Sequence, residues 1–215
     1  MRFIGLFAAV MPVALATRAG AQMPATPVLQ NAWTNAGVTA AVDYGHAKGE
    51  NAWAAALAWS PSQARFQVSL GGGTISDSAT SRGGYGARIA VPLVQFAGGS
   101  IGTGVFAGVG YSARAGARES NFPLGVALGY RRPLGATRGI SMYVAPFYSL
   151  TRWKNDSTAV KHGLFRASAG VDITLAPQLG LTIGYEGGAH ATGADPGPRG
   201  GVVGVALSYA LRRQR

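Results

Sequence analysis

The feature that most constrains the fold is a two-residue alternation between bulky apolar and small side chains, repeated along most of the chain. In the last segment, residues 203–211, Val, Val, Leu, Tyr and Leu alternate with Gly, Ala, Ser and Ala. A period of two belongs to β-strands, in which successive side chains point to opposite faces of the sheet. The alternation therefore predicts strands with one bulky apolar face and one face of small residues.

Ten segments follow this alternation with varying clarity, and none shows a convincing helical period. They are residues 36–44, 53–59, 65–73, 85–93, 100–112, 122–130, 140–150, 165–173, 179–186 and 203–211. The connections between them alternate between longer and shorter, and the longest runs over residues 187–200. This order predicts an up-and-down antiparallel meander with all of its longer loops at one end.

The scarcity of charge decides which face meets which environment. Only 13% of the residues are charged and 33 of 215 are Gly, whereas soluble domains carry about 25% charged residues. The small-residue face cannot serve as a soluble surface, but it suits a narrow barrel interior, and the bulky face suits lipid. We therefore expect an all-β, up-and-down antiparallel transmembrane β-barrel with ten strands, with eight or twelve strands as the alternatives.

The first residues have the layout of an export signal. Met1 and Arg2 precede an apolar run from Phe3 to Ala16, and Ala19-Gly20-Ala21 offers the small residues that a signal peptidase reads. About 14 apolar residues fall short of the roughly 20 that a membrane-spanning helix needs. We expect residues 1–21 to be a cleaved signal peptide, residues 22–32 a periplasmic N-terminal segment and residues 33–215 the barrel.

With this topology the charged and aromatic residues divide between the interior and the two ends of the barrel. Equal numbers of cations and anions face the interior, which predicts an ion-paired lumen network of Asp43, Arg65, Arg88, Arg166, Asp172 and Glu186. Aromatic residues fall near both ends of the strands, as in the interfacial girdles of membrane proteins. They are Trp53, Tyr85, Tyr111, Tyr148 and Tyr185 at the loop end, and Trp59, Tyr130 and Tyr209 at the turn end.

On these patterns the chain resembles the small outer-membrane β-barrel proteins of Gram-negative-type bacteria, of the OmpA- and OmpW-like kind, over about residues 33–211. The most specific likeness is the C-terminal strand, Gly204-Val205-Ala206-Leu207-Ser208-Tyr209, which is similar to the signal that barrel-assembly machinery reads. The chain departs from that signal by continuing to Arg215. The resemblance implies a porin-like, monomeric barrel in the outer membrane, with extracellular loops, periplasmic termini and contacts to the bilayer and lipopolysaccharide.

No motif points to chemistry or to nucleic acid. The net charge of +11 falls to +9 without Arg2 and Arg18 of the signal peptide; it is spread over both ends of the barrel, where lipid phosphates are the expected neighbours, and forms no stripe for nucleic acid. The chain has no Cys, and His46, His162 and His190 lack metal-ligand spacing. No glycine-rich phosphate loop precedes a helix. We therefore expect neither a cofactor nor a metal.

The function expected from these observations is a non-enzymatic structural or surface-interaction role with an ion-paired, largely closed lumen. A narrow channel for small solutes is the alternative. A second alternative is an enzyme that modifies outer-leaflet lipid, of the lipid A acyltransferase or deacylase type. It would need a Ser nucleophile beside a His base, and His162 with Ser149 or Ser157, oriented by Glu50 or Asp156, is the candidate set.

Overall fold

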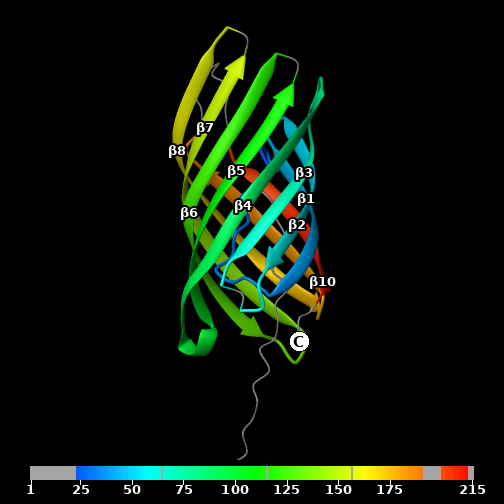
Figure 1. The fold of residues 1–215 in the computed structure, drawn as a ribbon, viewed down its shortest axis with the longest axis vertical. Helices are drawn as coiled ribbons and strands as arrows, with labels where there is room; N and C mark the ends of the chain where they lie inside the picture. The colour runs from blue at the N-terminus through cyan, green and yellow to red at the C-terminus, as the bar shows by residue number, and fades with distance from the viewer. Residues whose placement is uncertain (1–22, 64, 115, 156, 191–199, 213–215) are drawn as a thin grey trace, which may run out of the picture.

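Antiparallel strands close into one barrel in the computed structural model, which describes residues 23–63, 65–114, 116–155, 157–190 and 200–212 (Figure 1). The described residues form ten strands. They are β1 (Gly37–Ala47), β2 (Glu50–Ser60), β3 (Gln67–Asp77), β4 (Ser81–Phe96), β5 (Ile101–Arg114), β6 (Ala117–Pro133), β7 (Gly139–Asn155), β8 (Ala159–Ala176), β9 (Leu179–Gly188) and β10 (Val202–Arg212). A 3-10 turn, η1 (Ala97–Gly99), joins β4 to β5.

Each strand pairs with its neighbours in the chain, and the last strand returns to the first. β1 and β10 pair along their lengths, with Val42 opposite Leu207 and Gly45 opposite Gly204. Closure removes the free sheet edge that an open sheet would expose. The prediction of a ten-stranded up-and-down antiparallel barrel is therefore confirmed.

The two faces of the strands divide as the alternation predicts. On β9, Gly180, Thr182 and Gly184 are buried inside the barrel, whereas Ile183 and Tyr185 are exposed on the outside. The same division holds on β2, where Trp53, Leu57 and Trp59 are exposed and the alternate alanines are buried, namely Ala52, Ala54, Ala56 and Ala58. The outer surface therefore carries the bulky apolar residues, and the inner surface carries the small ones.

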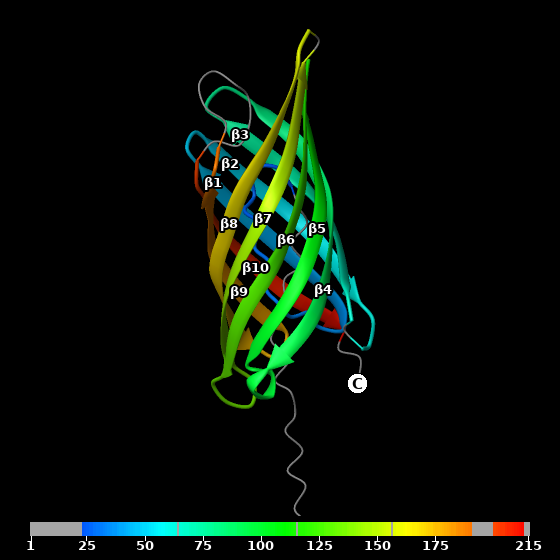
Figure 2. The ribbon, with the colours of Figure 1, turned by 90° about the vertical axis from the view of Figure 1, so that its left-hand side faces the viewer.

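The wall of the barrel is uneven in height. Strands β4 to β8 have 14 to 18 residues, whereas the other five have 10 or 11. The β5–β6 and β7–β8 hairpins consequently rise above the rest of the loop end (Figure 1 and Figure 2).

Two predicted connections between strands, residues 113–121 and 152–162, are mostly strand, so the expected longer loops at one end are reduced to the β9–β10 connection. The reason is that the ladders continue to tight turns: β5 and β6 pair up to Arg114 and Ala117, and β7 and β8 up to Lys154 and Ala159. The Asn155 side chain accepts hydrogen bonds from the backbone N–H groups of Ser157 and Thr158 and so stabilises the second turn.

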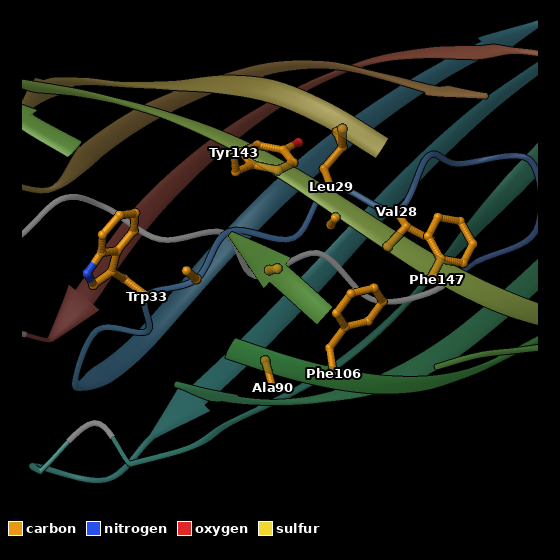
Figure 3. Packing of buried hydrophobic residues seen from close by; sticks show 10 residues of the cluster. Val28, Leu29, Trp33, Ala90, Phe106, Tyr143 and Phe147 are labelled. Carbon is orange, nitrogen blue, oxygen red and sulfur yellow. The ribbon is translucent and has the colours of Figure 1, made fainter. Parts of the chain in front are cut away.

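The N-terminal segment before β1 lies inside the barrel. Val28, Leu29 and Trp33 are almost completely buried, packed against side chains of the surrounding wall (Figure 3). Those wall residues are Ala90 of β4, Phe106 of β5, Ala127 of β6 and Tyr143, Ala145 and Phe147 of β7. Residues 22–32 were expected to form a periplasmic segment outside the barrel. The structure differs: residues 23–32 fill the lumen because the small inner side chains of ten strands leave space that other atoms must occupy.

Candidate functional site

The candidate functional site is the lumen together with the segment that fills it, here called the lumen segment (residues 23–36). The segment passes through the barrel from the loop end to the turn end. Met23 lies near the loop end, where it packs with Ala52, Ala54 and Ile75. Trp33 lies near the turn end, and β1 then begins at Gly37. One extended stretch of chain therefore occupies the length of the interior.

The upper half of the lumen segment is held by an ion pair of the barrel wall. Arg166 of β8 and Glu186 of β9 form a buried salt bridge, with 2.7 Å between Nε and Oε1. The other carboxylate oxygen of Glu186 accepts the backbone N–H of Val28 at 2.7 Å. Arg166 also donates to the backbone carbonyls of Ala189 and Gly200, at 2.8 and 2.9 Å. One pair thus ties the lumen segment to the wall and to both ends of the β9–β10 loop.

The middle of the lumen segment is held by a second carboxylate. Asn31 donates from Nδ2 to Oδ2 of Asp172 at 2.5 Å and to the hydroxyl of Ser141 at 2.6 Å. Thr182 donates to the other Asp172 oxygen at 2.5 Å. Arg88 of β4 lies across the lumen and donates to the backbone carbonyl of Leu29 at 3.4 Å. These groups satisfy buried polar atoms that would otherwise be costly to leave unpaired.

Trp33 anchors the lumen segment at the turn end. Its indole lies over Gly102 of β5 and Gly129 of β6, and a Cβ at either position would come far inside van der Waals contact with the ring. The guanidinium of Arg131 covers the same ring at 5.0 Å from its centroid, within the range of a cation–π contact. These two glycines therefore form a hollow in the wall that receives the indole.

The structure places five of the six residues of the predicted lumen network inside the barrel. Asp43, Arg88, Arg166, Asp172 and Glu186 are all buried on the inner face, and Arg166 pairs with Glu186. Arg65 is not part of the lumen, because it is exposed in the turn between β2 and β3, just before β3 begins. Nothing in the sequence indicates a further role that the structure shows: Glu186, Asp172 and Arg88 bind the lumen segment.

A hollow of about 530 Å³, here called the vestibule, opens at the loop end and reaches down to the lumen segment. Its lower lining includes Pro24, Ala25 and Thr26. Near its rim, Arg82 lies between two carboxylates, 3.1 Å from Glu50 and 3.6 Å from Glu119. The vestibule is therefore a polar hollow with paired charges, and it meets the lumen segment at its inner limit.

The residues considered for lipid-modifying catalysis are not assembled into a catalytic pair. Ser149 of β7 lies opposite Leu164, and His162 of β8 lies opposite Thr151, so the two candidates sit at different levels of the wall. Within the described chain no hydrogen bond joins His162 to a serine, and Ser157 bonds to Asn155. Glu50 is paired with Arg82. Asp156 lies outside the described residues.

The exterior carries the predicted aromatic residues. Seven of the eight are exposed: Trp53, Trp59, Tyr85, Tyr130, Tyr148, Tyr185 and Tyr209. Tyr111 is half-buried because it packs on Tyr85, with 5.1 Å between ring centroids. Between them the outer surface is apolar, with Leu57, Leu70, Leu124 and Phe165 each more than half exposed. Exposure of such a surface to water is unfavourable, whereas the acyl chains of lipids would cover it.

A closed antiparallel barrel with an apolar outer face defines a β-barrel of the outer-membrane type. No protein-family model matches the chain, and no curated protein matches it. Among solved structures, the chain is similar to the KdgM porin in complex with disordered oligogalacturonate, with 7% identity and a TM-score of 0.43 over 81% of this chain and 99% of that one. It is also similar to Ail, the attachment invasion locus protein of Yersinia pestis, with 7% identity and a TM-score of 0.29 over 80% and 91%. Both TM-scores are below 0.5, so the barrel geometry, and not either likeness, defines the class.

Neither a membrane-spanning helix nor a metal centre is found in the part of the chain that the structure describes. No described helix is long and apolar enough to cross a membrane. No group of three or more His, Asp or Glu side chains among the described residues could hold a metal ion. The predicted signal peptide, residues 1–21, lies outside the described residues.

Proposed function

We propose that the protein is an outer-membrane barrel whose lumen is closed by its own N-terminal segment, and that it acts at the cell surface through its loop end. The observation that carries this proposal is the burial of residues 23–33 along the whole lumen. The segment contacts the wall at Glu186, Asp172, Arg88 and the Trp33 hollow. We expect a lumen filled in this way to block solutes, which favours a structural or surface-interaction role over transport.

The orientation belongs to the same proposal. The two hairpins that rise highest, the vestibule and the longest connection, from β9 to β10, lie at the loop end. Bacterial outer-membrane barrels carry short turns on the periplasmic side and longer loops outside. We therefore place the loop end at the cell surface and propose export by the signal in residues 1–21.

Single-channel conductance in planar bilayers tests the closed lumen. The mature chain, beginning at Gln22, is expected to show no stable open level. A chain lacking residues 22–33 is expected to conduct, because deletion of this segment empties the interior. A milder variant, N31A together with W33A, removes the anchors in the middle and at the turn end of the lumen segment and is expected to open transiently.

The matched control for this experiment is L134A, which truncates an exposed side chain in the turn between β6 and β7. It should leave conductance at the level of the unchanged chain. A stable, ion-selective open level in the unchanged chain would contradict the closed lumen and favour the small-solute channel. That alternative is supported by the vestibule, which gives a solute access to the upper part of the interior.

The lipid-modifying enzyme is a weaker proposal, because Ser149 and His162 lie at different levels and are not joined by a hydrogen bond among the described residues. Mass spectrometry of lipid A from cells with and without the protein distinguishes the enzyme from a structural or surface-interaction protein. Unchanged acylation is the result expected from a structural or surface-interaction role.

A further inference from the structure

The inner wall near the loop end carries five buried polar atoms that have no hydrogen-bond partner within the described part of the chain. They are Nε of Arg82, Oγ of Ser112, Oδ1 of Asn121, Oγ1 of Thr151 and Nε2 of His162. Most buried polar groups in proteins are hydrogen-bonded, and leaving one unpaired costs free energy. A cluster of such atoms on one wall therefore indicates a hydrogen-bonding partner from outside the chain.

Strand pairing brings these residues together on the inner face of β4 to β8. Asn121 of β6 lies opposite Thr151 of β7, and Thr151 lies opposite His162 of β8. Ser112 lies on β5, the other neighbour of β6. Arg82, Ser112 and Asn121 line the vestibule, and Ser112 is only 1% exposed. Unpaired polar atoms thus surround one hollow, with Thr151 and His162 in the same row as Asn121.

The first turn of the lumen segment forms the floor of the vestibule. In this turn the backbone N–H and the hydroxyl of Thr26 both donate to the carbonyl of Met23, at 3.2 and 2.7 Å. Pro24, Ala25 and Thr26 line the hollow at its inner limit. Its volume of about 530 Å³ lies within the range of about 300–1,000 Å³ that is typical of pockets for small ligands. The vestibule therefore has the size of a binding pocket and a floor made by the chain itself.

The charges around the vestibule balance. Four cationic and four anionic residues line it, namely Lys48, Arg82, Arg118 and Arg166, and Glu50, Asp77, Glu119 and Glu186. Arg166 pairs with Glu186, and Arg82 lies between Glu50 and Glu119. What the wall offers to a ligand is therefore a set of neutral donors and acceptors, without a net charge.

Trp153 gives the vestibule an aromatic face. It lies on β7 directly opposite Glu119, and it lines the hollow together with Ser112 and Asn121. The residue is only half-buried, so part of its surface is available for contact. An indole supplies a large, rigid apolar surface. The C–H face of a sugar ring packs against such a surface, while the sugar hydroxyls point away from the edge of the ring toward polar groups.

We propose that the vestibule binds one unit of a neutral sugar, held by hydrogen bonds to Ser112 and Asn121 and packed against Trp153. A hydroxyl both donates and accepts, so sugar hydroxyls match a wall that offers the Asn121 carbonyl, the Ser112 hydroxyl and the Nε–H of Arg82. An anionic ligand is disfavoured, because Arg82 and Arg166 already pair with carboxylates. This inference deepens the proposed role at the cell surface and rests on it, because that orientation places the mouth of the vestibule outside the cell.

The test measures sugar binding to the full chain by saturation-transfer NMR titration, in a detergent without a sugar headgroup. The probes are the methyl glycosides of glucose, galactose and mannose, trisaccharides that end in each of these sugars, and methyl glucuronide as the anionic counterpart of methyl glucoside. The variant is S112A with N121A, which removes two of the unpaired groups. The matched control is S168A, which removes another buried hydroxyl that has no described partner, on β8 and outside the vestibule lining.

At least one of the three methyl glycosides is expected to bind, equally to the unchanged chain and to S168A. The S112A/N121A variant should bind it about 30-fold more weakly, the loss expected from two hydrogen bonds. If the double variant does not fold, S112A alone should weaken binding about fivefold without lowering the thermal unfolding midpoint, because its hydroxyl has no described partner. W153A should also weaken binding, and W153F should restore most of it, because an aromatic face remains.

The trisaccharides distinguish the source of the sugar within the proposal. Tighter binding of a trisaccharide than of its methyl glycoside would assign the vestibule to the end of a glycan chain. Equal binding of the two would assign it to a free sugar. Both results support recognition of one neutral sugar unit.

Three results would overturn the proposal. The first is that none of the three methyl glycosides binds the unchanged chain, which would mean that water alone occupies the vestibule. The second is a loss in S168A as large as that in S112A/N121A. The third is tighter binding of methyl glucuronide than of methyl glucoside. Binding in micelles depends neither on orientation nor on a closed lumen, so failure of the proposed function would appear separately, as a stable open level of the unchanged chain in planar bilayers.

Discussion

Glu186 joins the barrel wall to the segment inside it. One carboxylate oxygen pairs with Arg166 and the other accepts the backbone N–H of Val28, both at 2.7 Å. The Arg166 side chain is only 2% exposed, so its charge depends on this partner and on two backbone carbonyls. Breaking a buried pair leaves an uncompensated charge, and its cost therefore exceeds that of breaking an exposed pair.

We predict that E186Q lowers the free energy of unfolding by about 3–5 kcal/mol. The control is E50Q, which makes the same chemical change in the Arg82 pair, where the Glu50 side chain is 33% exposed. It should cost no more than about 1 kcal/mol. Urea titration of the folded fraction in lipid vesicles measures both. Equal losses of unfolding free energy in the two variants would show that the buried pair of Arg166 and Glu186 stabilises the fold no more than the exposed pair does.

At the residue scale, the alternation predicted which residues face inward, but it did not indicate that some of them bind the lumen segment. Alternation and charge balance predicted that Asp43, Arg88, Arg166, Asp172 and Glu186 face inward, and all five are buried. Arg65 was misplaced because the strand that it precedes begins two residues later, at Gln67. The hollow for Trp33 was invisible in the sequence, since Gly102 and Gly129 are far apart along the chain and meet the indole only after closure.

The β7–β8 hairpin is the most extended element at the loop end. Its upper pairs, from Thr151 opposite His162 to Lys154 opposite Ala159, lie beyond the rows that carry the aromatic and apolar exterior. Strands β9 and β1 are shorter and do not reach this height (Figure 2). The top of the hairpin should therefore contribute little to closure of the barrel.

Shortening this hairpin tests that statement. Replacing residues 154–159 by Asn-Gly joins the opposed residues Trp153 and Val160 through a two-residue turn of the kind that suits antiparallel strands. We expect the variant to fold, with the thermal unfolding midpoint changed by only a few degrees. The control is the same Asn-Gly replacement placed lower, between Tyr148 and Phe165, which should abolish folding because it removes wall that encloses the lumen. Loss of the fold in the first variant would contradict the prediction.

Element boundaries were the part that sequence patterns located least well. The alternation placed all ten strands, yet residues 113–121 and 152–162 were assigned to loops because polar and charged residues interrupt the apolar face there. The backbone ladder continues regardless, since above the lipid-facing rows an outward residue such as Arg152 or Lys161 can be charged without leaving the strand. Polarity marked the end of the apolar surface and not the end of the strand.

At the scale of the whole molecule, the barrel has an apolar exterior and a filled interior. The exposed large hydrophobic residues lie on the outer faces of the strands, and the buried cluster lies inside around Val28, Leu29 and Trp33. Closure pairs every strand on both sides. Such a barrel resists unfolding by detergent, because along the paired length of the strands the backbone groups hydrogen-bond within the wall.

Gel mobility provides the test at this scale. The detergent-extracted protein should migrate differently before and after boiling, because detergent leaves the closed barrel compact and heat unfolds it. The control is a chain that ends at Gly188, which lacks β10 and cannot close against β1. Its mobility should not change on boiling. Identical migration of the full chain in both conditions would contradict a detergent-resistant barrel.

The sequence by itself determined the class of fold, the number of strands, and which residues face inward and outward, because a period of two and a scarcity of charge are local properties of the chain. Only the tertiary structure decided what fills the barrel. The interior left by ten strands of Gly, Ala and Ser is a property of the closed ring and not of any single strand, and Val28, Leu29 and Trp33 become core residues only when the ring closes around them. Strand pairing likewise decides that Arg118 lies beside Lys154 and Arg152 beside Lys161 on adjacent strands.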